Sequence, residues 1–253
     1  MIMTGTIINV AAILLGGVIG LFFGSRLPER VRSTITAGLG LFTTLIGIQM
    51  FLKTEQSLVV LGSLVLGGLL GEWLRIEDRL RSLGVWLEKT FIPGAKKTVE
   101  PGLLPDESSN ASAIDAANRS LRFVRGFMAA SLLFAIGPIA ILGSIQDGLA
   151  HDFNLLAIKS ALDFFASIAF ASSLGIGVLF SALIILVYQG SITLLAAQVE
   201  AVVSGPMMTE MTAVGGVLLL GIAFSNLLEI KTIRVGNFLP ALFIAPLIMA
   251  FIK

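Results

Sequence analysis

The amino-acid sequence predicts an all-α protein, a polytopic transmembrane helix bundle with about eight spans. Of its 253 residues, 56% are hydrophobic and only 13% are charged, and the mean hydropathy is +0.96. A water-soluble domain of this length does not need so many apolar residues to fill one core. The 27 glycines are typical of helices that pack closely in lipid, where small residues let backbones approach.

Several apolar segments are long enough to cross the hydrocarbon core, which takes about 20 helical residues. The predicted spans are 3–24, 34–52, 57–74, 127–145, 155–172, 175–188, 211–228 and 235–252. The N-terminus lacks a basic region before its first apolar run, so we expect no cleavable signal peptide.

Basic residues gather in three of the predicted loops, and short cytoplasmic loops retain lysine and arginine. These residues are Arg26, Arg30 and Arg32; Arg75, Arg79, Arg81, Lys89, Lys96, Lys97, Arg119, Arg122 and Arg125; and Lys231 and Arg234. One orientation places all of them inside and leaves Lys53, Lys159 and Lys253 as exceptions. It predicts that both termini lie outside.

The stretch 191–206 has two interpretations. With the sixth span ending outside and the seventh starting outside, it should not cross the membrane. Gln198 and Glu200 lie among its apolar residues, which favours a re-entrant or interfacial segment. The alternative is a ninth crossing, which would move Lys231 and Arg234 outside.

The chain divides into three parts within one membrane domain. Residues 1–91 form a three-span unit that ends in an amphipathic surface helix, because apolar residues from Trp73 to Leu87 recur at helical spacing between charged ones. Residues 92–120 are rich in Pro, Gly, Ser and acidic residues, which predicts a cytoplasmic linker. Residues 121–253 form a C-terminal multispan unit.

Recurring dipeptides suggest an internal repeat of a helical hairpin, a form of symmetry common among transporters. They are Gly16-Gly17, Gly67-Gly68 and Gly215-Gly216, and Leu41-Phe42, Leu133-Phe134 and Leu242-Phe243. The alternative is chance recurrence in a chain rich in glycine and leucine. The pairs Gly16/Gly20 and Gly67/Gly71 also suit close helix packing or a homodimer.

Lys159 and Asp163 are charged residues inside a predicted span, where charge is costly and usually paired. They are four residues apart on one helical face, so they can neutralise each other. The structural interpretation is an ion pair that fixes helix register. The functional interpretation is a substrate, proton or cation site.

Helix-breaking residues stand beside polar ones at several further positions. The breakers are Gly137, Pro138, Gly143, Gly148 and Pro240, and the polar residues are Gln146, Asp147, Gln189 and Asn237. Proline and glycine ease unwinding and free backbone carbonyls, which can coordinate a cation. Each position alone is more often a kink or a helix end. Together with Lys159 and Asp163 they predict one hydrated pathway for an ion or solute.

Six segments carry a resemblance to a known family. They are GTIIN at 5–9, GPIAILGSIQDG at 137–148, KSALD at 159–163, YQG at 188–190, MTAVGG at 211–216 and IRVGNFLPA at 233–241. In this order they resemble the YqgA/YdfK-like family of bacterial multispanning membrane proteins, domain of unknown function 554. The resemblance implies a location in the bacterial cytoplasmic (inner) membrane. It implies no activity and no catalytic residue.

The residue inventory separates three classes of function. The chain has no cysteine and one histidine, His151, and lacks a paired acid-base motif, so we expect no enzyme and no cofactor; the sequence leaves any metal undetermined. We expect a secondary transporter or channel-like protein for an ion or small polar solute. The alternative is a non-transporting membrane scaffold or regulatory partner. The expected partners are the lipid bilayer, the solute and a second copy of the chain, and no nucleic acid.

Overall fold

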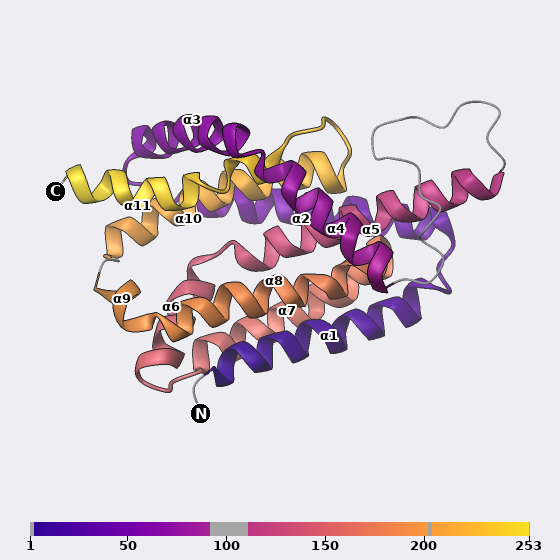
Figure 1. Cartoon of the computed structure of the whole chain (residues 1–253), viewed down its shortest axis with the longest axis horizontal. Coiled ribbons are helices and arrows are strands. Elements are labelled where there is room, and N and C mark those ends of the chain that lie inside the picture. The colour runs from indigo at the N-terminus through magenta and orange to yellow at the C-terminus, as the bar shows by residue number, and fades with distance from the viewer. Residues whose placement is uncertain (1–2, 92–110, 202–203, 253) are drawn as a thin grey trace.

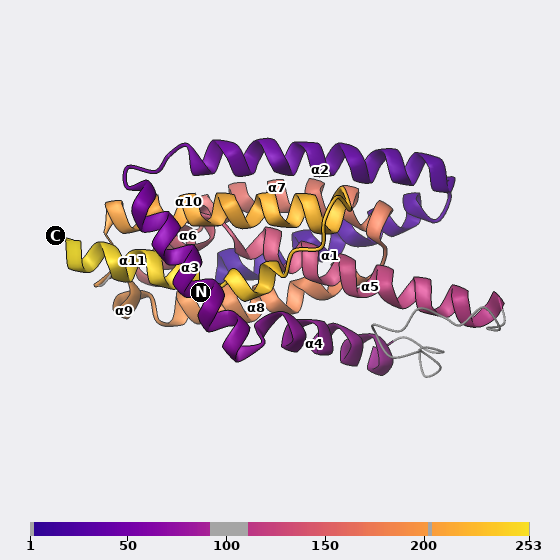
Figure 2. The same cartoon turned by 90° about the horizontal axis from the view of Figure 1, so that it is seen from above.

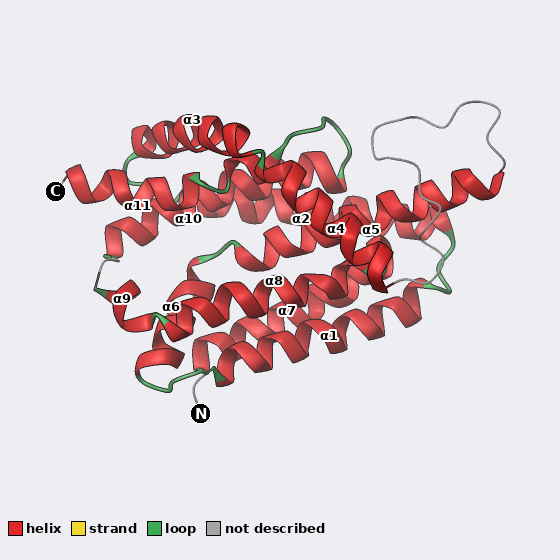
Figure 3. Ribbon diagram, viewed as in Figure 1, coloured by secondary structure: helices red, strands yellow, loops and turns green. Residues whose placement is uncertain are grey.

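The computed structural model describes residues 3–91, 111–201 and 204–252. Over these ranges it contains helices and loops and no strand (Figure 3). The α-helices are α1 (Thr4–Gly24), α2 (Glu29–Phe51), α3 (Ser57–Leu74), α4 (Ile76–Phe91), α5 (Ala111–Ala135), α6 (Pro138–Leu149), α7 (Asn154–Leu174), α8 (Gly177–Leu194), α9 (Ala196–Glu200), α10 (Gly205–Ile222) and α11 (Ala241–Ile252). A π-helical turn, η2 (Ala223–Leu227), extends α10, and a 3-10 turn, η3 (Val235–Phe238), precedes α11. The all-α prediction is confirmed.

The number of spans also agrees with the sequence. Among the described residues, 7 helices are long and apolar enough to cross a membrane, and a bent pair makes up to 8. The bent pair is α5 with α6, whose axes meet at 62°. Gly137 lies at the bend with φ 151°, a backbone conformation that glycine adopts without steric cost, and Pro138 begins α6. The predicted broken span is therefore present at this position.

The helices form two groups that lie side by side (Figure 1). In one group α2 packs against α10, and α3 packs against α11. In the other α1 packs along α7 and α8, and α6 contacts α7 and α8. Helix α5 packs on α8 and also touches α7 and α10, so it joins the two groups. Seen from above, α2 and α4 lie on opposite flanks (Figure 2).

The stretch 191–206 does not form a ninth span. Helix α8 continues to Leu194 and α10 begins at Gly205, so both enter the stretch from neighbouring spans. Between them α9 has only 5 residues, far fewer than the roughly 20 that a crossing needs.

The described part of the predicted linker 92–120 is helical. Helix α5 begins at Ala111, so residues 111–120 are helical, and residues 92–110 lie outside the described part of the chain. The composition rule missed this because the helix begins with small and polar residues that carry no apolar periodicity. The predicted surface helix corresponds to α4, which buries Leu87 against α5 residues such as Phe123 and Phe127.

The glycine pairs pack within the chain. A Cβ on Gly16 would lie 2.3 Å from the Phe164 carbonyl oxygen, and one on Gly20 would lie 2.3 Å from that of Ile168. A Cβ on Gly71 would lie 1.8 Å from the Asn237 carbonyl oxygen. Because their small faces are occupied by α7 and η3, these glycines carry no argument for the expected homodimer. Helices α1, α3 and α10 run in the same direction (Figure 1), as a repeat would require, and the repeat itself stays a prediction.

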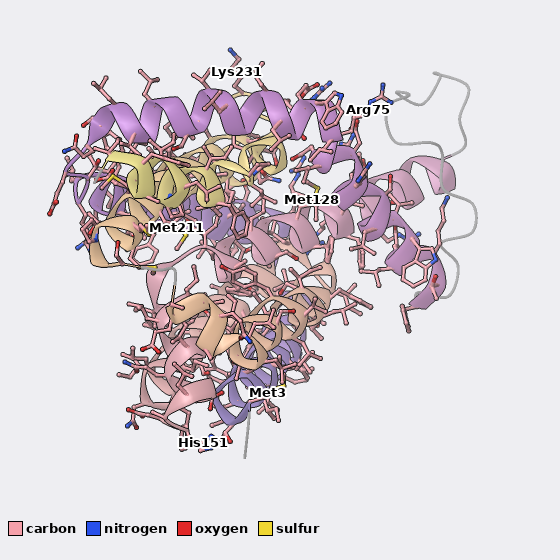
Figure 4. The ribbon with its side chains drawn as sticks, turned by 60° about the vertical axis from the view of Figure 1, so that its left-hand side comes forward. Met3, Arg75, Met128, His151, Met211 and Lys231 are labelled. Carbon is pink, nitrogen blue, oxygen red and sulfur yellow. The ribbon has the colours of Figure 1, made fainter. Side chains whose placement is uncertain are left out.

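The two ends of the bundle differ in charge. Helix α1 begins and α11 ends at one end, which we call the terminal end (Figure 1). The α1–α2 loop, α4 and the loop after η2 lie at the other end, which we call the basic end because it carries the clustered arginines and lysines. His151 lies beside Met3 (Figure 4). That the basic end faces the cytoplasm stays a prediction, based on the retention of basic residues in short cytoplasmic loops.

Single-cysteine labelling tests this orientation in a chain that contains no cysteine of its own. A membrane-impermeant maleimide added to intact cells is expected to label His151→Cys and to leave Lys231→Cys unlabelled, since both side chains are exposed but lie at opposite ends. Labelling of both variants after the membrane is permeabilised is the control. The reverse pattern in intact cells would contradict the topology.

Candidate functional site

A run of polar side chains is buried where α1 packs against α6, α7 and α8. We call it the polar column; its members, all buried, are Thr6, Asn9, Asp147, Lys159, Asp163, Gln189 and Thr193. Burying polar groups among apolar helices costs free energy unless they find hydrogen-bond partners. The hydrogen-bond partners of these side chains therefore show which of their polar groups are paired within the chain.

The first level of the polar column lies at the terminal end. The Gly5 backbone N–H, in the first turn of α1, donates to Asp147 Oδ2 of α6 at 3.0 Å. This N–H has no helical acceptor of its own, because the first N–H groups of a helix are left unpaired. On the same turn the hydroxyls of Thr6 and Thr193 lie 3.4 Å apart. These contacts tie α1 to α6 and α8.

The second level lies one turn further along α1. Asn9 Nδ2 donates to Gln189 Oε1 of α8 at 3.2 Å. Both side chains are fully buried. Residues four apart on a helix share a face, so Gly5 and Asn9 point toward the same neighbours. The second level thus continues the first along one face of α1.

The third level is the ion pair that the sequence predicts. Lys159 Nζ donates to Asp163 Oδ2 within α7, and the two side chains are 8% and 11% exposed. The Asn9 amide also interacts with the Asp163 carboxylate, which joins this level to the second. Ser160 bonds the carbonyl of Leu156 on its own helix. Removing either charged partner would leave the other unpaired in a low-dielectric interior.

Three atoms of the polar column have no hydrogen-bond partner among the described residues. They are Asn9 Oδ1, Asp147 Oδ1 and Gln189 Nε2. Buried polar side-chain atoms are nearly always paired with protein or water, so an unpaired one calls for an explanation. Two of the three are acceptors on neighbouring levels. These three atoms are therefore available to interact with water, a cation or a polar solute.

Beyond the third level the α1–α7 seam closes. Ser167 Oγ donates to the Ile13 carbonyl of α1 at 2.8 Å. From there toward the basic end Gly16 and Gly20 hold the two backbones in contact. No side chain larger than hydrogen fits at those two glycine positions without displacing α7. The column therefore extends from the terminal end only part of the way along the bundle.

Asn237 belongs to a second polar cluster at the junction of α3, α4 and η3. Its Oδ1 accepts from the Glu77 N–H at 2.8 Å, and its Nδ2 donates to Glu72 Oε2. Glu77 Oε2 accepts from the Gly236 N–H at 2.7 Å, and Arg234 pairs with Glu72 at 2.6 Å. The structure does not bring Asn237 to the polar column, because η3 packs on α3 and α4 and not on α7.

Glu77 should make stability depend on pH. Burial raises the pKa of the Glu77 carboxyl above its ordinary value of 4.5, against the opposing hydrogen bond from Gly236. A raised pKa in the folded state means that stability is highest below the ordinary pKa and falls as pH rises through the raised one. Glu77→Gln removes this titration. We expect the variant to unfold at a higher temperature than the wild type at pH 8, with the difference shrinking toward pH 5.

The other predicted residues divide between the two sites and the surface. Gln189 and Asp147 join the column, whereas Gln146 is exposed on α6. Gly143 and Gly148 were expected to break the helix but lie inside the continuous α6. A Cβ on Gly148 would lie 2.3 Å from the Thr193 carbonyl oxygen, so this glycine permits close packing on α8. Pro240 does mark a break, between η3 and α11.

Comparison with known proteins identifies the family. A family described as "Protein of unknown function (DUF554)" matches residues 4–250. The chain belongs to the DUF554 family. It is 32% identical over 241 residues to the "Uncharacterized protein YqgA" of Escherichia coli (strain K12), covering 95% of this chain and 94% of that one. It is 28% identical over 251 residues to the "Uncharacterized membrane protein YdfK" of Bacillus subtilis (strain 168), covering 98% and 96%. No solved structure matches.

Four of the segments that carry the DUF554 resemblance meet at the polar column. GTIIN provides Thr6 and Asn9, and the segment at 137–148 provides Asp147. KSALD provides the ion pair, and YQG provides Gln189. Asn9 and Gln189, which are 180 residues apart in the chain, are thus brought into one buried place.

Sequence reasoning missed several polar residues of this DUF554 chain. Thr6, Asn9 and Thr193 were not predicted as site residues. Asn9 could have been, because it lies four residues after Gly5 and so shares the helical face that packs against other helices. Glu210, only 1% exposed, was also missed. It accepts from the backbone N–H groups of Glu55 at 2.8 Å and Gln56 at 3.0 Å, so it secures the start of α3. Within the described residues no three His, Asp or Glu side chains are placed to hold a metal ion.

Proposed function

We propose that this DUF554 protein is a secondary transporter or channel-like protein for an ion or a small polar solute. The polar column is its proposed binding site, and the bacterial cytoplasmic membrane, with both termini outside, is its proposed location. The observation that carries the proposal is the group of three buried, unpaired polar atoms on Asn9, Asp147 and Gln189. A column that served helix packing alone would be expected to pair these groups with one another.

The charges of the column favour a cation or a solute with a positive group. Asp147 and Asp163 carry two negative charges when ionised, and Lys159 carries one positive charge. Lys159 is already paired with Asp163, so Asp147 is left with a single neutral donor, the Gly5 N–H. A buried carboxylate needs a compensating charge or a proton. A cation or a proton at Asp147 supplies it.

The shape of the seam supports access from one side at a time. The three levels of the column begin at the terminal end, and the glycine contacts of Gly16 and Gly20 close the seam toward the basic end. Passage across the membrane would require α1 and α7 to separate there. Discontinuous helices often form the substrate sites of transporters, and α6, which follows the bend after α5, contributes Asp147 to the polar column.

Flux measurements on reconstituted vesicles test the proposal. Purified protein in liposomes with an internal pH dye would be given gradients of H⁺, Na⁺, K⁺ or Li⁺ in turn. We expect one of these gradients to drive flux above protein-free liposomes. Asp147→Asn and Asp163→Asn are each expected to reduce that flux by about tenfold or more, because the amide keeps the shape and loses the charge.

Asp152→Asn is the matched control, since Asp152 lies exposed in the α6–α7 loop and makes the same chemical change outside the column. Its flux should equal that of the wild type. Equal losses in all three variants, or no gradient-driven flux for any ion of the panel with folded protein, would contradict the proposal. A non-transporting scaffold would then be the better account.

A further inference from the structure

Two cavities lie at the basic end, away from the polar column. The first, of about 480 Å³, is lined by α2, α5 and η2 and includes Ser33, Arg32, Arg122 and Arg125. The second, of about 330 Å³, lies between α1, α5 and the α7–α8 junction. Arg32, Arg122 and Leu174 line both cavities. The two guanidinium groups therefore stand in the wall that the cavities share.

The hydrogen bonding of these two arginines is incomplete. Arg122 donates from Nε to the Ser173 carbonyl at 3.1 Å, and its two terminal nitrogens make no hydrogen bond to any described residue. Arg32 donates to the Gly24 carbonyl at 2.7 Å and pairs with Glu29 at 3.3 Å, while its buried Nε has no partner. The Glu29 side chain is 88% exposed, so it lies at the rim.

The positive charges of the arginines are a second reason to expect an anion in this place. Arg32 and Arg122 both line the two cavities, so their two positive charges face the same space. The third arginine of the first cavity, Arg125, is already paired with Glu229. An anion between Arg32 and Arg122 would relieve the repulsion and accept from the unused donors. The planar fork of arginine suits phosphate oxygens in particular.

The second cavity also has an apolar wall, formed by Leu21, Phe123, Leu174 and Ile176, and Ile176 is 41% exposed at the surface of the bundle. Its other lining residues include Ser25, Glu88, Arg119 and Ser172. A free phosphate ion would gain nothing from such walls, whereas an acyl chain or glycerol backbone would be buried against them. Basic pockets between transmembrane helices at the cytoplasmic side are suited to anionic lipid headgroups.

We propose that Arg32 and Arg122 bind the phosphate group of an anionic glycerophospholipid from the leaflet at the basic end. The phosphate lies between the two guanidinium groups, the rest of the headgroup occupies the first cavity, and the apolar part of the lipid lies against the second cavity. This site is independent of the polar column and of the proposed transport. Bound lipid links α1, α2, α5 and the α7–α8 junction, so it should stabilise the fold.

Thermal unfolding in detergent tests the lipid site. The wild type would be titrated with a short-chain phosphatidylglycerol, a phosphatidylcholine of the same chains, or inorganic phosphate. Phosphatidylglycerol is expected to raise Tm by about 3 °C or more, and the other two by less than half as much. Arg32→Gln combined with Arg122→Gln should abolish the increment specific to phosphatidylglycerol.

The matched control is Arg26→Gln combined with Arg30→Gln. It removes two positive charges from the same part of the chain, and neither residue lines either cavity. This variant should keep the full increment. Equal losses in the two double variants would show general charge attraction and overturn the site. An increment from inorganic phosphate as large as that from phosphatidylglycerol would overturn the lipid assignment.

A labelling experiment covers the case in which the double variant fails to fold. Ser33 is exposed and lines the first cavity, so Ser33→Cys reports on its occupancy in an otherwise unchanged chain. Phosphatidylglycerol is expected to slow maleimide labelling about threefold or more relative to phosphatidylcholine. Lys231→Cys, exposed at the same end outside both cavities, should show no difference. Equal rates at Ser33→Cys in the two lipids would overturn the proposal.

Discussion

Asp163→Leu alone is expected to destabilise the protein more than Asp163→Leu combined with Lys159→Met. The single change leaves the buried Lys159 ammonium without its carboxylate, and breaking one side of a buried pair costs about 3–5 kcal/mol. The double change removes both charges and leaves apolar side chains of similar size. The cost of the unpaired charge then disappears, although Asn9 also loses its contact with the carboxylate.

Thermal unfolding of the two single variants and the double variant, in one detergent, measures the coupling. The double variant should unfold at a higher temperature than Asp163→Leu. Additive losses in Tm would contradict a coupled pair. Asp152→Asn, in the exposed α6–α7 loop, controls for the loss of a negative charge; its amide oxygen can still accept from the Asn154 N–H, so Tm should change little.

Gly16→Ala and Gly38→Ala are expected to change stability in opposite directions. The Cβ added at Gly16 would lie 2.3 Å from the Phe164 carbonyl oxygen, a backbone atom that cannot turn aside. Helix α7 would have to move as a whole, and overpacking of this kind costs about 1–3 kcal/mol. At Gly38, in α2, a Cβ meets nothing within 4 Å. Alanine there removes the helix penalty of glycine, about 1 kcal/mol.

The measurement is the Tm of each purified variant beside the wild type. Gly16→Ala should unfold at a clearly lower temperature, and Gly38→Ala at the same or a slightly higher one. A Gly16→Ala protein as stable as the wild type would show that the α1–α7 seam can open at low cost. That result would contradict the close backbone packing of α1 on α7.

The spans were predictable because each depends on a local property. A run of apolar residues is hydrophobic enough to enter lipid whatever its neighbours are, so 3–24 and 57–74 agree closely with α1 and α3. The bend at Gly137-Pro138 was also local, because these residues restrict or free their own backbone. The start of α5 was not predictable, because the small and polar residues that follow Ala111 do not by their composition indicate a helix.

The site was predictable only in part, because it depends on which helices are neighbours. Gln146 and Asp147 are adjacent in sequence, and only the packing of α6 decides that Asp147 is buried and Gln146 exposed. Asn9 and Gln189 meet across 180 residues, a pairing that no local pattern indicates. Asn237 has an amide side chain like those of Asn9 and Gln189, yet it contacts Glu72 and Glu77 because η3 lies on α3 and α4.

The spacing of the glycines has a consequence for the alignment of α1 with α7. Gly16 meets Phe164, Gly20 meets Ile168 and Gly24 meets Ser172, so both series advance in steps of four residues.

A slide of α1 by four residues, about 6 Å, would offer Gly16 and Gly20 the next carbonyls of the same series. Glycines alone therefore leave two alignments nearly equivalent. The Asn9–Gln189 bond and the Gly5–Asp147 contact have no equivalent four residues further along α1, because position 13 is an isoleucine and N–H groups beyond the first turn are paired within the helix. The polar groups thus fix the alignment of α1 along α7, which the glycine spacing alone does not determine. A solute bound at Asp147, as proposed above, would compete with the Gly5 contact and weaken the interaction that holds α1 in this alignment.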